Sequence, residues 1–168
     1  TVHLIGLGLM GGSLAMALRG QVGRITAEDI ASGVIEDAAR RGIIDGPGAS
    51  GDADIVVLAV PAHTIIDLVA GLALRPGTLV LDLGSTKTRI CQALDALPPG
   101  VLAVGGHPMC GLAENGYAHA IPTLYQGARF VLCETQRTTS EARLIAEALV
   151  YAAGAQPLWM DRARQDRL

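Results

Sequence analysis

Two side chains suited to proton transfer, His107 and Ser85, each follow a short apolar segment. His107 lies in GGHPMCG, between glycines, whereas a core histidine would be expected inside a periodic apolar segment. An imidazole changes charge near neutral pH and can act as acid or base. Ser85 lies in LDLGSTK, where it or Thr86 could instead cap the next helix. The sequence therefore predicts His107 as the general acid or base and leaves Ser85 as either a site residue or a helix cap.

Lys87 is the second charged candidate in the LDLGSTK segment. The chain has twelve arginines and a single lysine, so Lys87 is the one position at which the positively charged side chain is not an arginine. A compact ammonium suits a carboxylate or carbonyl substrate, although a single residue can also arise by chance. We take Lys87, Gly106 and Glu114 as candidate substrate contacts.

The remaining histidines and the cysteines are weaker candidates for a catalytic or metal-binding role. His63 is expected at a helix start, and His3 and His119 are expected to be structural or exposed. The three cysteines, Cys91, Cys110 and Cys133, form no CxxC pair and no Cys/His cluster. This predicts neither a disulfide framework nor a metal site, and it favours a reducing, cytoplasmic setting. Cys110 has no evident base partner, which argues against a thiolate nucleophile.

A glycine turn near the start of the chain predicts a phosphate-binding site. A strand-like run leads into GLGLMG and then into an apolar helical segment. In such a turn Gly6 permits the tight bend, Gly8 lets a pyrophosphate approach the backbone, and Gly11 lets the helix pack close to the strand. Free amides at the helix start then face the anion. The predicted cofactor contacts here are Gly6, Leu7, Gly8, Leu9, Met10 and Gly11.

An acidic residue follows the second expected strand. Asp29 stands about twenty residues after the glycine turn, where a dinucleotide fold places the carboxylate that binds the adenosine ribose. That carboxylate would repel the extra phosphate of NADP, so we expect NAD rather than NADP. Two alternatives remain: Asp29 caps the next helix, or Glu28 is the ribose ligand. Val60 and Pro61, where another expected strand ends, are further predicted cofactor contacts.

Short β-rich runs alternate with segments of helical length, which is typical of βαβ units. The expected strands are 2–6, 24–28, 54–60, 78–82, 101–104, 129–133 and 156–160; the expected helices are 11–19, 32–41, 64–74, 86–97 and 140–153. This order predicts an α/β fold, a doubly wound, mostly parallel Rossmann-type sheet with helices on both faces. Residues 105–127 form one long irregular stretch, and such a loop is usually functional.

Composition limits the possible classes of protein. At 168 residues, half of them apolar, the chain suffices for one compact domain. A net charge of −3 and 3% aromatic residues argue against nucleic-acid binding. Residues 1–18 carry no Lys, Arg, Asp or Glu, but they lack a basic leader and contain four glycines, so neither a signal peptide nor a membrane span is predicted.

The ends of the chain suggest a longer protein. Residue 1 is not Met, and residues 161–168 read as the first turns of a helix with no stop signal. We expect a dinucleotide-binding domain over residues 1–160, and in residues 161–168 the start of a connection to a helical domain absent from this chain. A naturally frayed terminus is the alternative.

With these segments in order, the sequence resembles the prephenate/arogenate dehydrogenase family of tyrosine biosynthesis. The resemblance spans the whole chain and rests on GLGLMGGSLAMAL, VVLAVP, LDLGSTK, GGHPMCG and LYQGARFVLCE. It implies NAD-dependent oxidative decarboxylation of prephenate or arogenate. His107 matches the catalytic histidine, and Ser85 matches the serine that orients the substrate hydroxyl and the nicotinamide. It also implies a following helical domain that forms a homodimer.

One departure and two alternative functions qualify this resemblance. Many family members carry an acidic residue followed by Lys-Ser-Gly after the His-Pro-Met loop, whereas here residues 112–116 read LAENG. A β-hydroxyacid dehydrogenase would need a catalytic lysine on a later helix, and this chain has none there. A non-catalytic NAD sensor would need Asp29 but not the pairing of His107 with Ser85.

Overall fold

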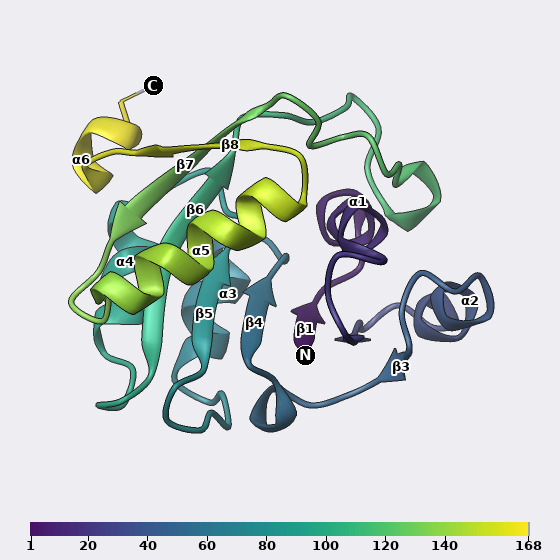
Figure 1. Ribbon diagram of the computed structural model, residues 1–168, viewed down its shortest axis with the longest axis horizontal. Helices are drawn as coiled ribbons and strands as arrows, with labels where there is room; N and C mark the ends of the chain where they lie inside the picture. Colours follow the sequence, from purple (N-terminus) through teal and green to yellow (C-terminus); the bar gives the residue numbers. More distant parts are fainter. Residues whose placement is uncertain (168) are drawn as a thin grey trace.

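The computed structural model describes residues 1–167 and contains one eight-stranded sheet in the order β3-β2-β1-β4-β5-β6-β7-β8 (Figure 1). Its strands are β1 (Val2–Ile5), β2 (Ile25–Glu28), β3 (Gly46–Pro47), β4 (Ile55–Leu58), β5 (Leu79–Asp82), β6 (Leu102–Pro108), β7 (Arg129–Glu134) and β8 (Gln156–Trp159). The order changes direction at β1, where the chain crosses from the β2 side to β4. Ligands of open α/β sheets bind at such a switch point.

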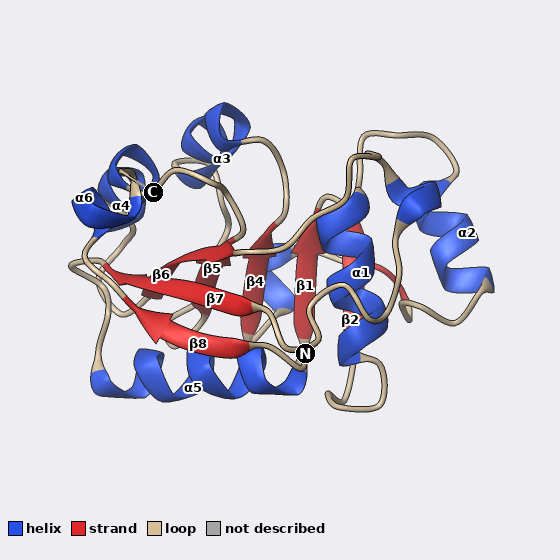
Figure 2. Ribbon diagram, turned by 90° about the horizontal axis from the view of Figure 1, so that it is seen from above, coloured by secondary structure: helices blue, strands red, loops and turns tan. Residues whose placement is uncertain are grey.

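Helices cover both faces of the sheet (Figure 2). They are α1 (Leu9–Leu18), α2 (Val34–Arg40), α3 (Ala62–Val69), α4 (Thr88–Asp95), α5 (Ser140–Ala152) and α6 (Arg162–Gln165), with short 3-10 turns η1 (Ser50–Asp52) and η2 (Tyr117–His119). α1 and α5 lie against one face and α3 and α4 against the other, while α2 lies beside the β3 edge. Among the described residues, no helix is long and apolar enough to cross a membrane.

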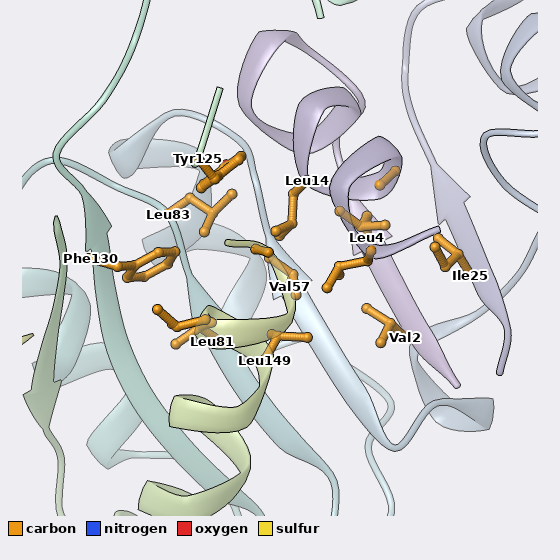
Figure 3. Packing of buried hydrophobic residues seen from close by; sticks show 14 of the residues in the cluster. Val2, Leu4, Leu14, Ile25, Val57, Leu81, Leu83, Tyr125, Phe130 and Leu149 are labelled. Atoms are coloured by element: carbon orange, nitrogen blue, oxygen red, sulfur yellow. The ribbon is translucent and has the colours of Figure 1, made fainter. Parts of the chain in front are cut away.

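Alternating side chains of the central strands build two cores. Leu4 of β1, Val57 of β4 and Leu81 of β5 point toward α1 and α5 (Figure 3), whereas Leu58 and Val80 point toward α3 and α4. Successive side chains of a strand face opposite sides, so a strand buried on both faces must be apolar throughout. The continuous apolar runs at 55–58 and 79–81 are explained in this way.

The predicted fold class is confirmed, with local differences at β6 and β3. β3, β2, β1, β4, β5 and β6 are parallel, and β7 runs antiparallel to β6. β6 extends to Pro108 rather than ending at residue 104, because residues 104–108 pair with β7. His107 therefore lies in a strand opposite Val131, not in a loop, and the irregular stretch begins only at residue 109. The two-residue strand β3 was not predicted.

Candidate functional site

The glycine turn joins β1 to α1, and two of its glycines are required by its geometry. Gly6 has φ +97°, and a Cβ there would lie 2.7 Å from the Ala59 carbonyl oxygen. A Cβ on Gly11 would lie 2.0 Å from the Gly6 carbonyl oxygen, so only glycine lets α1 approach the turn this closely. Gly8 faces open space, with nothing within 4 Å, and α1 begins after it without a side-chain cap. The turn thus leaves room and free amides for an anion.

Asp29 holds this turn from the end of β2. Its Oδ2 accepts a hydrogen bond from the Leu7 amide at 2.7 Å, and its Oδ1 accepts one from the Ala31 amide at 2.7 Å. α2 begins at Val34 after Gly33, with no side-chain cap. Asp29 therefore does not cap this helix, and its carboxylate is fixed against the glycine turn.

A hollow of about 420 Å³ lies beside Asp29. It is lined by Ala27, Glu28, Asp29, Ile35, Glu36, Ala39, Pro47 and Gly48. Apolar walls next to carboxylates, here those of Glu28, Asp29 and Glu36, suit the adenosine end of a dinucleotide. Both acids considered from the sequence, Asp29 and Glu28, line this hollow, so position alone does not separate them.

A larger cleft of about 530 Å³ opens at the carboxyl ends of the central strands. Its lining is Gly8, Leu9, Met10, Ala59, Val60, Pro61, Ala62, Leu83, Gly84, Ser85, Gly111, Leu112, Asn115 and Gly116. The structure thus brings Gly8, Leu9, Met10, Val60, Pro61 and Ser85 to one cavity, from three separate connections. Gly6, Leu7 and Gly11 are buried behind it.

Lys87 lies inside the protein, which corrects the expectation that it contacts substrate. Its side chain has no exposed surface; its ammonium pairs with Asp82 and donates to the Gly106 carbonyl at 2.6 Å. Gly106 is likewise used internally, because its amide donates to Asp82 Oδ1 at 2.9 Å. A Cβ on Gly106 would lie 2.3 Å from the Asp82 carbonyl oxygen. Both residues join β5 to β6, and neither presents a polar group to the cleft.

His107 and Ser85 are brought together by a third residue. Gln165 of α6 places its Nε2 2.5 Å from His107 Nδ1 and 3.3 Å from the Ser85 carbonyl oxygen. Ser85 is exposed and lines the cleft, whereas His107 is half-buried and is not among the residues that line it. Partial burial and then the Lys87 charge lower the pKa of His107, against the opposing charges of Asp82 and Asp166. The imidazole is therefore biased toward its neutral form, in which one ring nitrogen can accept a proton.

The other predicted residues lie outside this arrangement. Glu114 is exposed on the segment above the cleft, and its neighbours Leu112 and Asn115 line the cavity instead. His63 and His119 are exposed, whereas His3 is buried against Thr26. Burial raises the pKa of the Cys110 thiol, which disfavours its thiolate. No cluster of three or more metal-binding side chains occurs among residues 1–167.

Two residues at this site were missed in the sequence. Asp82 accepts from Gly106, Gly84 and Lys87, and its signal was a carboxylate that ends an apolar strand five residues before the only lysine. Gln165 had no sequence signal, because only tertiary packing brings α6 to His107.

The sheet topology, the glycine turn and the cleft define a nucleotide-binding domain of the doubly wound α/β class. The family model described as prephenate dehydrogenase, nucleotide-binding domain, matches residues 14–157. The chain therefore belongs to this family. It is 35% identical over 151 residues to a prephenate dehydrogenase of Lactococcus lactis subsp. cremoris, and 34% identical over 155 residues to one of Bacillus subtilis.

Solved structures agree with this membership. Prephenate dehydrogenase of Aquifex aeolicus, in complex with hydroxyphenyl propionate and NAD+, matches with a TM-score of 0.89 at 30% identity over 98% of this chain and 61% of that chain. Synechocystis arogenate dehydrogenase matches with a TM-score of 0.88 at 28% identity over 99% of this chain and 61% of that one. The chain spans less than half the length of the two sequence relatives: the matches cover 83% and 84% of it but only 42% and 41% of them.

Proposed function

We propose that the protein containing this chain is an NAD-dependent dehydrogenase that oxidatively decarboxylates prephenate or arogenate, with His107 as the base. The observation that carries the proposal is the contact of one nitrogen, Gln165 Nε2, with both His107 and Ser85, at the rim of the cleft that the glycine turn forms. The His107 imidazole at the end of β6 is thereby linked to the backbone of Ser85, whose residue lines the cavity. The family membership supports the same reaction.

The residues present fit NAD. The open side of Gly8 and the uncapped start of α1 suit its pyrophosphate. Asp29 lines the hollow in which the adenosine ribose would lie, and no arginine or lysine occurs in residues 29–33 to bind the extra phosphate of NADP. Val60, Pro61 and Ser85 would surround the nicotinamide end in the larger cleft.

When bound, NAD+ supplies the acceptor for a hydride. The hydride leaves the ring carbon that bears the hydroxyl, and His107 takes the hydroxyl proton, so that this carbon becomes a carbonyl. The bond to the ring carboxylate then breaks and carbon dioxide leaves. Its electron pair makes the ring aromatic, and the carbonyl oxygen gains a proton as the phenol. Ser85 would orient the hydroxyl for the transfer, and the positive nicotinamide would further favour a neutral imidazole.

We also propose the boundaries and setting of the domain. Residues 1–160 form the dinucleotide-binding domain, and residues 161–168, which include α6, begin the connection to a helical domain that forms a homodimer. Leu168 lies outside the described residues. A cytoplasmic location fits a small-molecule biosynthetic enzyme with unpaired cysteines.

The test is a steady-state assay of the full-length protein with prephenate and arogenate, each with NAD+ and NADP+. We expect reduced cofactor and carbon dioxide with at least one substrate, faster with NAD+. His107→Asn should lower kcat by about 100-fold or more while cofactor affinity changes little. Absence of turnover with all four pairs would refute the reaction. Retained NAD binding with no turnover in the wild type would instead favour a sensor.

A further inference from the structure

Gln165 is held in place by its surroundings in α6. Its side chain is 3% exposed. The carboxylate of Asp166 accepts hydrogen bonds from the amides of Lys87 and Thr88, and Arg162 pairs with Asp95 at 2.9 Å. These contacts join α6 to both ends of α4, so the position of Gln165 relative to His107 is fixed by the fold.

The neighbours of Gln165 decide which way its carboxamide points. The Ser85 carbonyl can only accept a hydrogen bond, so the amide nitrogen must face it. The same nitrogen then donates to His107 Nδ1, which must be unprotonated. The opposite orientation would set two carbonyl oxygens against each other and bury both amide hydrogens. An unsatisfied buried donor is costly, so the first orientation is preferred.

This orientation leaves two atoms without a hydrogen-bond partner, one on Gln165 and one on His107. Gln165 Oε1 is buried and accepts no hydrogen bond from any of residues 1–167. His107 Nε2 likewise contacts no hydrogen-bonding group in the described part of the chain, and it is not among the buried unpaired atoms. With Nδ1 accepting, the proton of the neutral ring lies on Nε2. A half-turn of the carboxamide would place Oε1 at Nδ1 and move that proton to Nδ1.

We infer that Gln165 is a positioning residue for His107: its carboxamide fixes the ring and determines which ring nitrogen carries the proton. In the cofactor-free protein Nε2 carries it. Nε2 can act as a base only after the carboxamide turns and Oε1 accepts from Nδ1–H. The tautomer assignment depends on the contacts alone, whereas the link to catalysis rests on the proposed function.

Gln165→Glu provides a near-isosteric test. A carboxylate can only accept, so it should move the proton of the neutral ring to Nδ1 and raise the pKa of His107. The charged groups that already act on this ring are Lys87, Asp82 and Asp166, and all remain in the variant. Gln92→Glu on α4 is the matched control, since Gln92 is exposed.

The first measurement is ¹⁵N NMR of histidine-labelled full-length protein without cofactor, with His107 assigned from the signal that His107→Asn removes. We expect the Nε2–H tautomer in the wild type and in Gln92→Glu, and the Nδ1–H tautomer in Gln165→Glu. An Nδ1–H tautomer in the wild type, or the same tautomer in all three proteins, would overturn the inference. Because this readout needs no turnover, it decides the inference even if the proposed reaction is wrong.

The second measurement is the pH profile of kcat/KM. His107 must be neutral to accept a proton, so activity should fall as the pH drops through its pKa, and Gln165→Glu should move that fall to higher pH. Gln165→Leu should lower kcat about 10- to 100-fold, with the KM for NAD+ nearly unchanged. A merely structural role would lower the stability of Gln165→Glu without moving its pH profile, and that result would contradict the catalytic link.

Discussion

Asp82 and Lys87 form an ion pair in which neither side chain has any exposed surface. The carboxylate also accepts from the amides of Gly84 and Gly106, each at 2.9 Å, and the ammonium donates to the Gly106 carbonyl. This pair therefore joins the end of β5, the turn that carries Ser85 and the strand that carries His107. It sets the relative position of the two candidate catalytic residues without facing the cleft itself.

Lys87→Met should strongly destabilise the protein. It leaves the charge of Asp82 buried with two amide donors but no opposite charge, and removal of one member of a buried pair costs about 3–5 kcal/mol. The measurement is the free energy of unfolding in denaturant. Arg75→Met is the control, because the Arg75 pair with Asp54 is largely exposed and should contribute little.

A double variant separates charge burial from packing. Asp82→Asn combined with Lys87→Met removes both charges, and it should be more stable than Lys87→Met alone. If Lys87→Met lost no more stability than Arg75→Met, the pair would have no structural role.

Gly106→Ala should disturb the same junction by steric overlap. The added Cβ would lie 2.3 Å from the Asp82 carbonyl oxygen and 2.9 Å from Phe130 Cε1. Overpacking of this kind typically costs about 1–3 kcal/mol. Thermal unfolding would measure the loss. Gly111→Ala is the control, since nothing lies within 4 Å of a Cβ there; equal losses in both variants would contradict the close approach of β6.

Local pattern was enough to predict most of the fold. The glycine turn, the apolar runs at 55–58 and 79–81 and the amphipathic helices depend on residues close together in the chain, and their types follow from periodicity. β6 was underestimated because its last residues are extended only through pairing with β7, more than twenty residues away. Gly105 and Gly106 look like loop residues in sequence, yet they are glycines because β6 passes close to Cys91 and Asp82.

Only part of the candidate site could be predicted, because some of its residues are placed by local pattern and others only by tertiary packing. Ser85 and His107 follow or end parallel strands, whose carboxyl ends meet at one edge of a sheet, so their proximity could be expected. The burial of Lys87 could not, because an ammonium after a strand is equally compatible with a ligand contact. The role of Gln165 depends on how α6 packs on α4, which no local pattern encodes.

Asp29→Asn should weaken cofactor binding. The carboxylate accepts from the Leu7 amide in the glycine turn and lines the hollow beside it. Asparagine has one acceptor oxygen where the carboxylate has two, so one of the hydrogen bonds from the Leu7 and Ala31 amides is lost and the turn is less firmly held. A hydrogen bond to a charged group contributes about 1.5–3 kcal/mol, so the Kd for NAD+ should rise roughly 10-fold or more by calorimetry. Discrimination against NADP+ should also fall, because the repelling charge is gone.

Glu28→Gln tests the alternative ribose ligand. Glu28 lines the same hollow, but only its backbone carbonyl bonds to the glycine turn, accepting from the Gly6 amide at 2.9 Å, and its side chain makes no hydrogen bond to the turn among the described residues. We expect a smaller change in the Kd for NAD+ than in Asp29→Asn. A larger change would assign the ribose contact to Glu28 instead.

Stability should decrease below about pH 6.5, partly because of His3. This side chain is fully buried, with Nδ1 3.0 Å from Thr26 Oγ1 and Nε2 without a partner among residues 1–167. Burial lowers the pKa of His3, against the opposing charges of Glu28 and Asp52. As the pH falls, the unfolded chain takes up a proton before the folded protein does, so the free energy of unfolding falls through this range.

The pH dependence can be assigned to His3 by comparing two substitutions. His3→Gln removes the titrating group, so its free energy of unfolding should change less between pH 7 and pH 5 than that of the wild type, even if the variant is less stable at pH 7. His119→Gln changes an exposed histidine in η2 and is the matched control variant. Burial also lowers the pKa of His107. The free energy of unfolding of His3→Gln should therefore still depend on pH, and this dependence should decrease further when His107→Asn is added. Equal slopes in the wild type and His3→Gln would show that the buried ring does not cause the acid sensitivity.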